Sequence, residues 1–168
     1  MAFDYCVPYP AERDLAELGV ERTWLWAQEC MEYHGNLVES GQTQQVLFAI
    51  VQGSTYRDLR RLSAEQLVAM EFPGYAIGGL SVGESKEEME DMLAGQIEHL
   101  PQEKPRYLMG VGYPEDILMA VSYGVDMFDC VLPTRNARTG NVFTSRGQIT
   151  YRNAAYADDS RPLDPECD

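Results

Sequence analysis

The chain has 168 residues, of which 45% are hydrophobic and 24% charged, a composition typical of one globular domain or a large part of one. No apolar run approaches the ~20 residues of a membrane span, and the N-terminal stretch lacks the basic region and apolar core of a signal peptide. The formal net charge of −14 argues against a general nucleic-acid binder with a basic face.

The charge is unevenly distributed along the chain. Residues 130–161 contain five arginines and two aspartates, a net charge of +3, whereas the acidic excess lies before them. We therefore expect any contact with a polyanion to lie in this C-terminal part, although a chance cluster in a short window explains the same counts. The four cysteines are widely spaced and form no CxxC pair, which favours reduced thiols in a cytoplasmic protein.

Apolar runs typical of buried strands alternate with helical patterns along most of the chain. A helix is predicted over residues 11–34, and three further helices follow the predicted strands. The second has Leu59, Leu62, Leu67 and Met70 on one face. The third begins at a capping box made by Ser85 and Glu88, and its apolar face is Met89, Met92, Leu93, Ile97 and Leu100. The fourth has Pro114 at its first position. The predicted strands are residues 1–4, 46–53, 74–80, 106–112 and 125–131.

Strands regularly separated by helices predict an α/β fold with a parallel sheet. A (β/α) barrel and a doubly wound open sheet both fit this order. The pattern changes after Asp129, where a Pro-containing loop is expected, and residues 141–153 are expected to form a β-hairpin that turns at Arg146-Gly147.

The candidate site follows from the strand ends, because active sites of parallel α/β proteins lie at the carboxyl edge of the sheet. The groups that converge there are carboxylates, an amide, glycines and a methionine. Together they suit the binding of a flat heterocycle such as a guanine-like base. These residues are Asp4 with Cys6, Gln52-Gly53, Gly78-Gly79-Leu80, Met109-Gly110 and Asp129.

Each of these residues also has an ordinary structural interpretation. Asp4 and Asp129 fit solvated strand ends, Gln52 fits a helix cap, Met109 fits the core, and the glycines fit a turn. His34 and His99 lie in helical patterns away from the strand ends, which makes a Ser-His-Asp or Cys-His mechanism unlikely.

Arg135 and Arg138 follow Asp129 closely. Guanidinium groups beside a carboxylate point to a negatively charged partner, with phosphate as the usual candidate, unless both arginines are simply solvated.

Four strings in the chain resemble the tRNA-guanine transglycosylases, the queuine/7-deazaguanine tRNA-ribosyltransferases. They are FAIVQG (48–53), AIGGLSVGES (76–85), RYLMGVGYPED (106–116) and DMFDCVLPTRNARTG (126–140), in the family's order. The resemblance implies a (β/α)₈ TIM barrel that exchanges guanine at the tRNA wobble position for a 7-deazaguanine base. It runs through nearly the whole chain.

The resemblance also implies roles for individual residues. Asp129 matches the nucleophile that forms a covalent ester with the ribose. The base-binding positions are Asp4, Cys6, Gln52, Gly79, Leu80 and Met109, with Ser81 and Glu84 beside them. The positions that contact tRNA are Gly110, Val111, Gly112, Tyr113, Pro114, Glu115 and Asp116, together with Thr134, Arg135, Asn136, Ala137 and Arg138.

The chain departs from the family pattern at three places. It lacks the Asp-Ser-Gly-Gly-Phe-Gln segment that carries the acid/base aspartate, and we count five of eight barrel strands. Cys167 matches the first ligand of the family's zinc site, but one thiolate cannot hold zinc, so we expect no zinc in this chain. Ser81 replaces an expected alanine, which leaves the preferred base open. We therefore expect an incomplete barrel domain over residues 1–168 that is inactive alone, or that pairs with the missing segment or in a homodimer.

Two other functions compete with the transglycosylase. One is a non-catalytic tRNA-binding or partner subunit of the same family, which would not need Asp4, Gln52 and Asp129 together. The other is an unrelated α/β enzyme for a small heterocycle, which leaves the two arginines after Asp129 unexplained.

Overall fold

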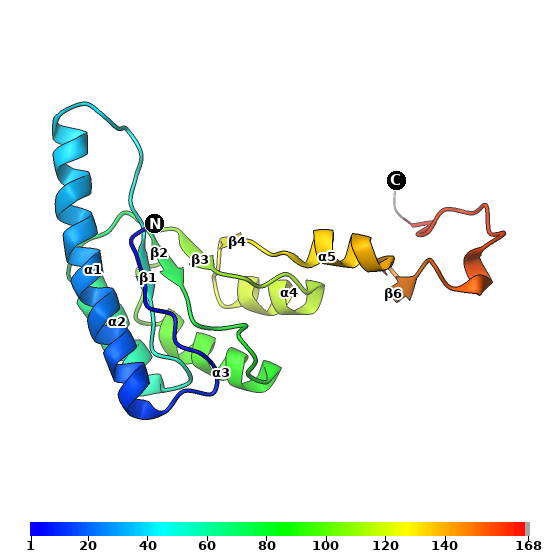
Figure 1. Cartoon of the computed structure of the whole chain (residues 1–168), viewed down its shortest axis with the longest axis horizontal. Coiled ribbons are helices and arrows are strands. Elements are labelled where there is room, and N and C mark those ends of the chain that lie inside the picture. The colour runs from blue at the N-terminus through cyan, green and yellow to red at the C-terminus, as the bar shows by residue number, and fades with distance from the viewer. Residues whose placement is uncertain (167–168) are drawn as a thin grey trace. The chain divides into compact units, whose positions relative to one another are not determined.

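Four short parallel strands form the sheet in the computed structural model of the chain (Figure 1), which describes residues 1–166. Their order is β1-β2-β3-β4, and every neighbouring pair is parallel. The strands are β1 (Ala49–Val51), β2 (Tyr75–Ile77), β3 (Arg106–Leu108) and β4 (Met127–Phe128). Parallel neighbours require crossover connections, and a helix lies in each of them. The α/β class with a parallel sheet is confirmed, and the sheet is not closed into a barrel within the described residues.

The chain divides into two units, residues 1–129 and the residues from Cys130 onward, and each unit is described here by itself. The first unit holds the sheet and four helices. They are α1 (Arg13–Glu39), α2 (Arg57–Val68), α3 (Lys86–Ile97) and α4 (Pro114–Ser122). Consecutive helices pack against one another in the same order as the strands. Pro114 is at the start of α4, as the sequence predicts.

Alternate strand residues determine which face of the sheet meets the helices. Val51, Ile77 and Leu108 are fully buried in one apolar cluster with helix residues such as Leu67 and Leu93. Side chains alternate between the two faces of a strand, so the intervening residues project to the face away from these helices. The entire predicted apolar face of α3 is also buried.

The apolar face predicted for α2 is wrong at one position. Leu62 is exposed, whereas Arg60 is fully buried together with Ser63 and Ala64. The buried side of α2 thus includes Arg60, Ser63 and Ala64 beside Leu59 and Leu67, and the Arg60 guanidinium finds hydrogen-bond acceptors there.

The predicted strand at residues 1–4 is also wrong. This segment is extended but does not form a strand; Ala2 N–H donates one hydrogen bond to the Phe48 carbonyl beside β1 (2.8 Å). It still places Asp4 next to the end of β1, where the predicted strand would have placed it.

The second unit contains a helix, a hairpin and a short 3₁₀ helix. They are α5 (Leu132–Thr139), β5 (Asn141–Thr144), β6 (Gly147–Thr150) and η1 (Ala154–Tyr156). The strands β5 and β6 pair antiparallel around a turn at Ser145-Arg146. The loop predicted after Asp129 is instead α5, which tolerates Pro133 in its first turn and ends at Gly140 in the left-handed conformation. No helix among residues 1–166 is long and apolar enough to cross a membrane.

The N-terminus of α3 carries the predicted capping box. Ser85 Oγ accepts a hydrogen bond from Glu88 N–H (3.1 Å), and the Glu88 carboxylate accepts one from Ser85 N–H (3.4 Å). Both satisfy backbone donors that a helix start otherwise leaves without partners.

We predict that Ser85→Ala lowers the free energy of unfolding by about 1 kcal/mol, because the side-chain acceptor at the helix start is lost. Urea denaturation followed by circular dichroism measures this change. Ser85→Asp is the control, since aspartate also accepts from the helix N–H groups and should retain most of the stability. Equal stability of Ser85→Ala and the unsubstituted chain would contradict the role of the cap.

Candidate active site

The register of the sheet places four predicted residues in one row. Ile50, Ala76, Tyr107 and Met127 are register partners across β1 to β4. The residue two positions after each of these partners lies just past the end of its strand, and its side chain points to the same face of the sheet. The row there consists of Gln52, Gly78, Met109 and Asp129, and it lies on the face away from the helices.

Gln52 and Asp4 form the first contact in this row. Gln52 Nε2 donates to Asp4 Oδ2 (2.6 Å), which fixes the amide orientation. Gln52 is fully buried, and its Oε1 has no hydrogen-bond partner among the described residues. A buried acceptor without a donor is costly, so this oxygen is suited to an N–H group of a bound molecule.

Glycine is required at two positions beside Gln52. A Cβ on Gly78 would lie 2.7 Å from Gln52 Nε2, and a Cβ on Gly79 would lie 2.3 Å from Gln52 Oε1. Gly79 also has a φ of +66°, which L-residues rarely adopt. The two glycines therefore give the Gln52 side chain its space across the row.

Behind these glycines lies Arg60, which sequence reasoning missed. Its guanidinium donates to the carbonyls of Ser54, Gly78 (3.1 Å) and Gly79 (3.0 Å), and to Gln96 Oε1 (2.6 Å). Burial lowers the pKa of Arg60 to about 10. An arginine in a helical pattern ordinarily predicts an exposed residue, so the sequence carries no signal for this position.

Cys6 lies near Asp4 and Gln52. The residue is exposed overall, yet burial around its sulfur, and then the charge of Asp4, raise the pKa of the thiol. Hydrogen bonds from the Gln52 side chain and the Gly79 N–H act in the opposite direction on this pKa. A thiol kept neutral is a poor nucleophile, so Cys6 is better suited to line the pocket than to react.

Asp129 is held through one of its two carboxylate oxygens. Tyr107 Oη donates to Asp129 Oδ1 (2.6 Å), and Gly110 N–H donates to the same atom (2.9 Å). No hydrogen bond to Oδ2 is found within residues 1–166. Burial, then the hydrogen bond to Asp129, raise the pKa of Tyr107 to about 12, so its hydroxyl stays a donor at neutral pH.

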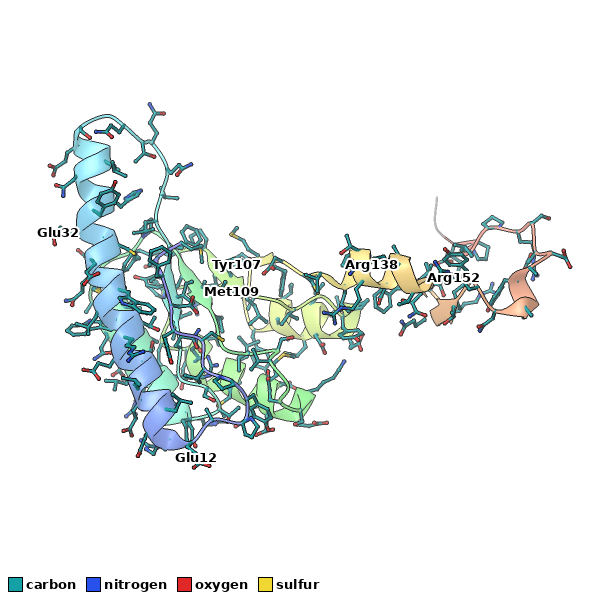
Figure 2. All side chains as sticks on the ribbon, in the orientation of Figure 1. Glu12, Glu32, Tyr107, Met109, Arg138 and Arg152 are labelled. Atoms are coloured by element: carbon teal, nitrogen blue, oxygen red, sulfur yellow. The ribbon has the colours of Figure 1, made fainter. Side chains whose placement is uncertain are left out.

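Tyr107 is a second residue that sequence reasoning missed. It lies on β3, two residues before Met109, and both residues are labelled in Figure 2. The period-2 pattern could have identified it, because a tyrosine on the same face as Met109 must approach the neighbouring strand end at Asp129.

The loop after Leu80 is closed by Glu84. Its carboxylate accepts hydrogen bonds from Ser81 N–H and from Val82 N–H (2.9 Å), and Ser81 has a φ of +59°. Leu80 is buried, whereas residues 81–83 after it are exposed.

The segment from Gly110 to Asp116 leads from β3 into α4. Lys86 Nζ lies 2.7 Å from Glu115 Oε1 and 2.9 Å from Asp116 Oδ1, and it lies over the Tyr113 ring. Val111 is buried. The two carboxylates are thus occupied by a lysine, which reduces the negative charge that this segment would present to an RNA.

Thr134 to Arg138 lie on α5 in the second unit. Asn136 is buried, with 9% of its surface exposed, whereas Arg135 and Arg138 are exposed. Figure 2 shows Arg138 on α5 and Arg152 in the residues that follow β6. Residues three apart on a helix lie on neighbouring positions of its surface, so both α5 arginines can contact one partner.

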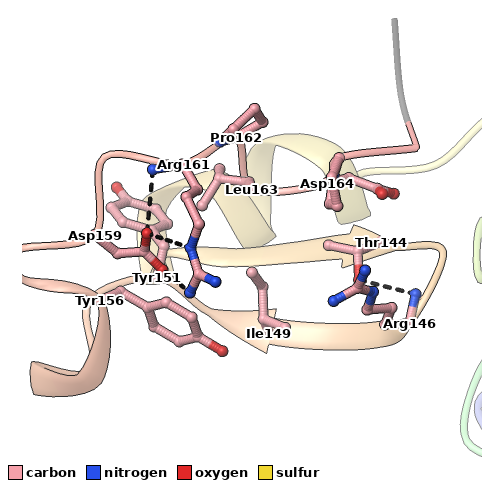
Figure 3. A pocket seen from close by; sticks show the side chains of 11 residues that line it. Thr144, Arg146, Ile149, Tyr151, Tyr156, Asp159, Arg161, Pro162, Leu163 and Asp164 are labelled. Carbon is pink, nitrogen blue, oxygen red and sulfur yellow. Dashed lines mark hydrogen bonds and ion pairs between the residues drawn. The ribbon is translucent and has the colours of Figure 1, made fainter.

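A cavity of about 610 Å³ lies within the second unit (Figure 3). Arg161 Nη2 lies 2.8 Å from Asp159 Oδ2 at its wall, and Tyr151, Tyr156 and Arg146 also line it. None of the residues predicted for the site lines this cavity.

The metal prediction falls on Cys167, which lies outside the described residues. Among residues 1–166, no group of three His, Cys, Asp or Glu side chains is arranged to hold a metal ion.

Known proteins resemble this chain along its whole length. The family model described as queuine tRNA-ribosyltransferase matches residues 1–168. Queuine tRNA-ribosyltransferases of Halothermothrix orenii and Caldanaerobacter subterraneus are each 56% identical over 168 residues, which is 100% of this chain and 43% and 44% of those proteins. The protein of that name from Bacillus velezensis is 56% identical over 167 residues, 99% of this chain and 42% of its own length. The chain thus spans less than half the length of these curated relatives.

We predict that the Tyr107 hydroxyl titrates near pH 12, and that its pKa falls in Asp129→Asn because the carboxylate charge is removed. Burial, the larger cause, should keep the pKa above the usual value of about 10. The measurement is ¹³Cζ tyrosine NMR against pH, with Tyr107→Phe identifying the signal. Since the folded pKa is raised, the protonated hydroxyl favours the folded state fully below pH ~10, and this contribution is lost towards pH 12. A Tyr107 signal that titrates at the ordinary value would contradict the contact.

Proposed function

This chain belongs to the queuine tRNA-ribosyltransferase family, and from that membership we propose that it contributes to the exchange of wobble guanine in tRNA for a 7-deazaguanine base. Because the chain spans 43% to 44% of two of these relatives, the activity proposed is that of the complete natural protein that contains it. The single observation that carries the proposal is the geometry of Asp129 at the strand-end row.

Asp129 is the proposed nucleophile because one of its oxygens is oriented and the other is available. Tyr107 and Gly110 hold Oδ1, which fixes the rotation of the carboxylate and leaves Oδ2 without a donor among the described residues. A fixed geometry of this kind removes orientational freedom that a reaction would otherwise have to lose.

The proposed reaction has two displacements at the same carbon. Asp129 Oδ2 bonds to the ribose anomeric carbon while the glycosidic bond breaks, and the electron pair of that bond leaves with guanine. The departing guanine takes up a proton at the released nitrogen. A ring nitrogen of the incoming base then bonds to the same carbon and gives up its proton, and the ester bond breaks to restore the carboxylate, so that the protons balance over the exchange. Two inversions give net retention, as in glycoside transfer through an enzyme-bound ester.

Base recognition is proposed for the pocket at the other end of the row. Asp4 and Gln52 Oε1 accept hydrogen bonds from base N–H groups, while the backbone at Gly79 and Leu80 contacts the opposite edge. Met109 packs on the ring and Cys6 lines the pocket. The hydrogen bond from Gln52 Nε2 to Asp4 Oδ2 holds the two side chains together, and Gln52 Oε1 has no partner among the described residues. The two side chains can therefore present acceptors to the donor-rich edge of guanine, which supports this assignment.

Contact with tRNA is proposed for two segments. Arg135 and Arg138 on α5, with Thr134, face the bases or phosphates around the wobble nucleotide, and residues 110–116 form the second contact. The net charge of +3 over residues 130–161 supports the first segment, since polyanion binding needs local positive charge.

The remaining features are proposed at the level of the family. The four-stranded parallel sheet is proposed to be part of a (β/α)₈ barrel, with β5–β6 as an insertion near its C-terminal part. Zinc is proposed for the full-length protein, beyond the described residues. The complete protein is proposed to act in the cytoplasm and to form a homodimer.

We predict that the isolated 168-residue chain turns over tRNA far more slowly than a full-length relative, because it corresponds to less than half of that relative. The measurement is incorporation of radiolabelled guanine into tRNA, with the Halothermothrix orenii protein as the positive control. Comparable turnover by the two would show that the site needs no other part of the relatives' length.

We predict that Asp129→Asn in the complete natural protein abolishes a covalent tRNA adduct, because an amide cannot form the ester. Denaturing gel electrophoresis after incubation with tRNA and a 7-deazaguanine base detects the adduct. Asp91→Asn is the matched control, since Asp91 pairs with Arg57 at the exposed surface. An adduct that persists in Asp129→Asn would refute the nucleophile, whereas tRNA binding without any adduct in the unsubstituted protein would favour a non-catalytic subunit.

A further inference from the structure

We propose that Arg60 is a positioning residue for base recognition, which turns the N–H groups of Gly79 and Leu80 towards the bound base. This inference rests on the proposed function, because it assigns the base pocket to the strand-end row. In this proposal Arg60 does not contact the base. Its guanidinium acts through the backbone of residues 78–80.

The contacts of Arg60 join four segments behind the pocket. The side chain begins on α2 and reaches the loop after β1, the loop after β2 and the α3 helix, through Ser54, Gly78, Gly79 and Gln96. Gly53 makes this approach possible, because a Cβ there would lie 2.6 Å from the Arg60 backbone nitrogen. One guanidinium nitrogen, Nη2, donates hydrogen bonds to both adjacent glycine carbonyls.

The carbonyl orientation determines the direction of the N–H groups. In a trans peptide the C=O and the following N–H point in opposite directions. Because the Gly78 and Gly79 carbonyls both point at Arg60, the N–H groups of Gly79 and Leu80 point away from it.

A separate contact supports this orientation for Gly79. The Gly79 backbone N–H lies near enough to the Cys6 sulfur to lower the pKa of that thiol. The Gly78–Gly79 peptide thus has Arg60 on its carbonyl side and the pocket residue Cys6 on its N–H side.

Leu80 N–H is available to a ligand. It has no acceptor among the described residues, although Leu80 itself is buried. A buried donor without a partner is costly, so the group that fits there is an acceptor such as a carbonyl oxygen or ring nitrogen of a planar base.

The positive charge of Arg60 is itself unusual. No carboxylate among residues 1–166 forms an ion pair with it, all its hydrogen-bond acceptors are uncharged, and the charge of Glu84 acts on it only at longer range. Burying a cation without a counter-ion is unfavourable, so a purely structural role would be served as well by an apolar side chain. A planar group with several fixed donors is, however, what binding two adjacent carbonyls requires.

The test compares Arg60→Lys with Arg61→Lys in the complete natural protein. Lysine keeps the charge but presents one compact ammonium, which cannot satisfy all four acceptors. Arg61 is the matched control because it is the next residue, is exposed, and lies 3.8 Å from Glu65. Calorimetric titration with 7-deazaguanine measures base affinity, and titration with an anticodon stem-loop measures tRNA affinity.

We expect Arg60→Lys to bind 7-deazaguanine about tenfold more weakly or worse, with tRNA affinity unchanged and Arg61→Lys unaffected. Unchanged base affinity in Arg60→Lys would overturn the inference and leave the proposed function intact. If the unsubstituted protein does not bind 7-deazaguanine, the proposed function fails and the role of Arg60 towards that base fails with it.

Amide NMR tests the positioning role of Arg60 separately from the identity of the bound base. The ¹⁵N–¹H signals of Gly79 and Leu80 should shift in Arg60→Lys and stay in place in Arg61→Lys; unshifted signals would overturn the positioning role whatever the pocket binds. If Arg60→Lys does not fold, Gln96→Leu replaces it, since it removes one acceptor that orients the guanidinium. Weaker base binding in Gln96→Leu then supports the inference, and unchanged binding overturns it.

Discussion

The buried guanidinium of Arg60 is the interaction on which the pocket geometry depends. It contacts the loops that follow β1 and β2 and also α3, and it does so through uncharged acceptors. Its position depends in turn on Gly53, whose missing side chain lets α2 begin close to the strand end. These residues thus depend on one another: Gly53 leaves room for Arg60, and Arg60 holds the carbonyls of Gly78 and Gly79.

Much of the fold could be predicted because its signals are local. The runs at 46–53 and 106–112 are apolar and end in glycine, and both contain strands. The capping box at Ser85 and the proline at the start of α4 are equally local and were found. The convergence of Gln52, Gly78, Met109 and Asp129 also follows from pattern alone, since parallel strands end at one edge.

The remaining features depend on tertiary contacts that a pattern does not encode. Arg60 is inside and Leu62 outside because the guanidinium finds carbonyls beyond β1 and β2, which a helical period cannot reveal. Residues 132–139 are an exception, because Pro133 is a local signal: it predicts a loop, yet it lies in the first turn of α5, where proline needs no N–H partner. Residues 1–4 remain extended without forming a strand, since a single backbone hydrogen bond at Ala2 links them to the residue before β1.

The two donors on Asp129 Oδ1 have a consequence for the stability of an ester at this residue. In an ester formed through Oδ2, Oδ1 is the carbonyl oxygen, and Tyr107 O–H and Gly110 N–H are already directed at it. Donors that hold this oxygen stabilise the carboxylate as a leaving group, because negative charge returns to it as the ester bond breaks. For the proposed nucleophile, the same hydrogen bonds that orient the carboxylate would therefore also ease its departure from the ester.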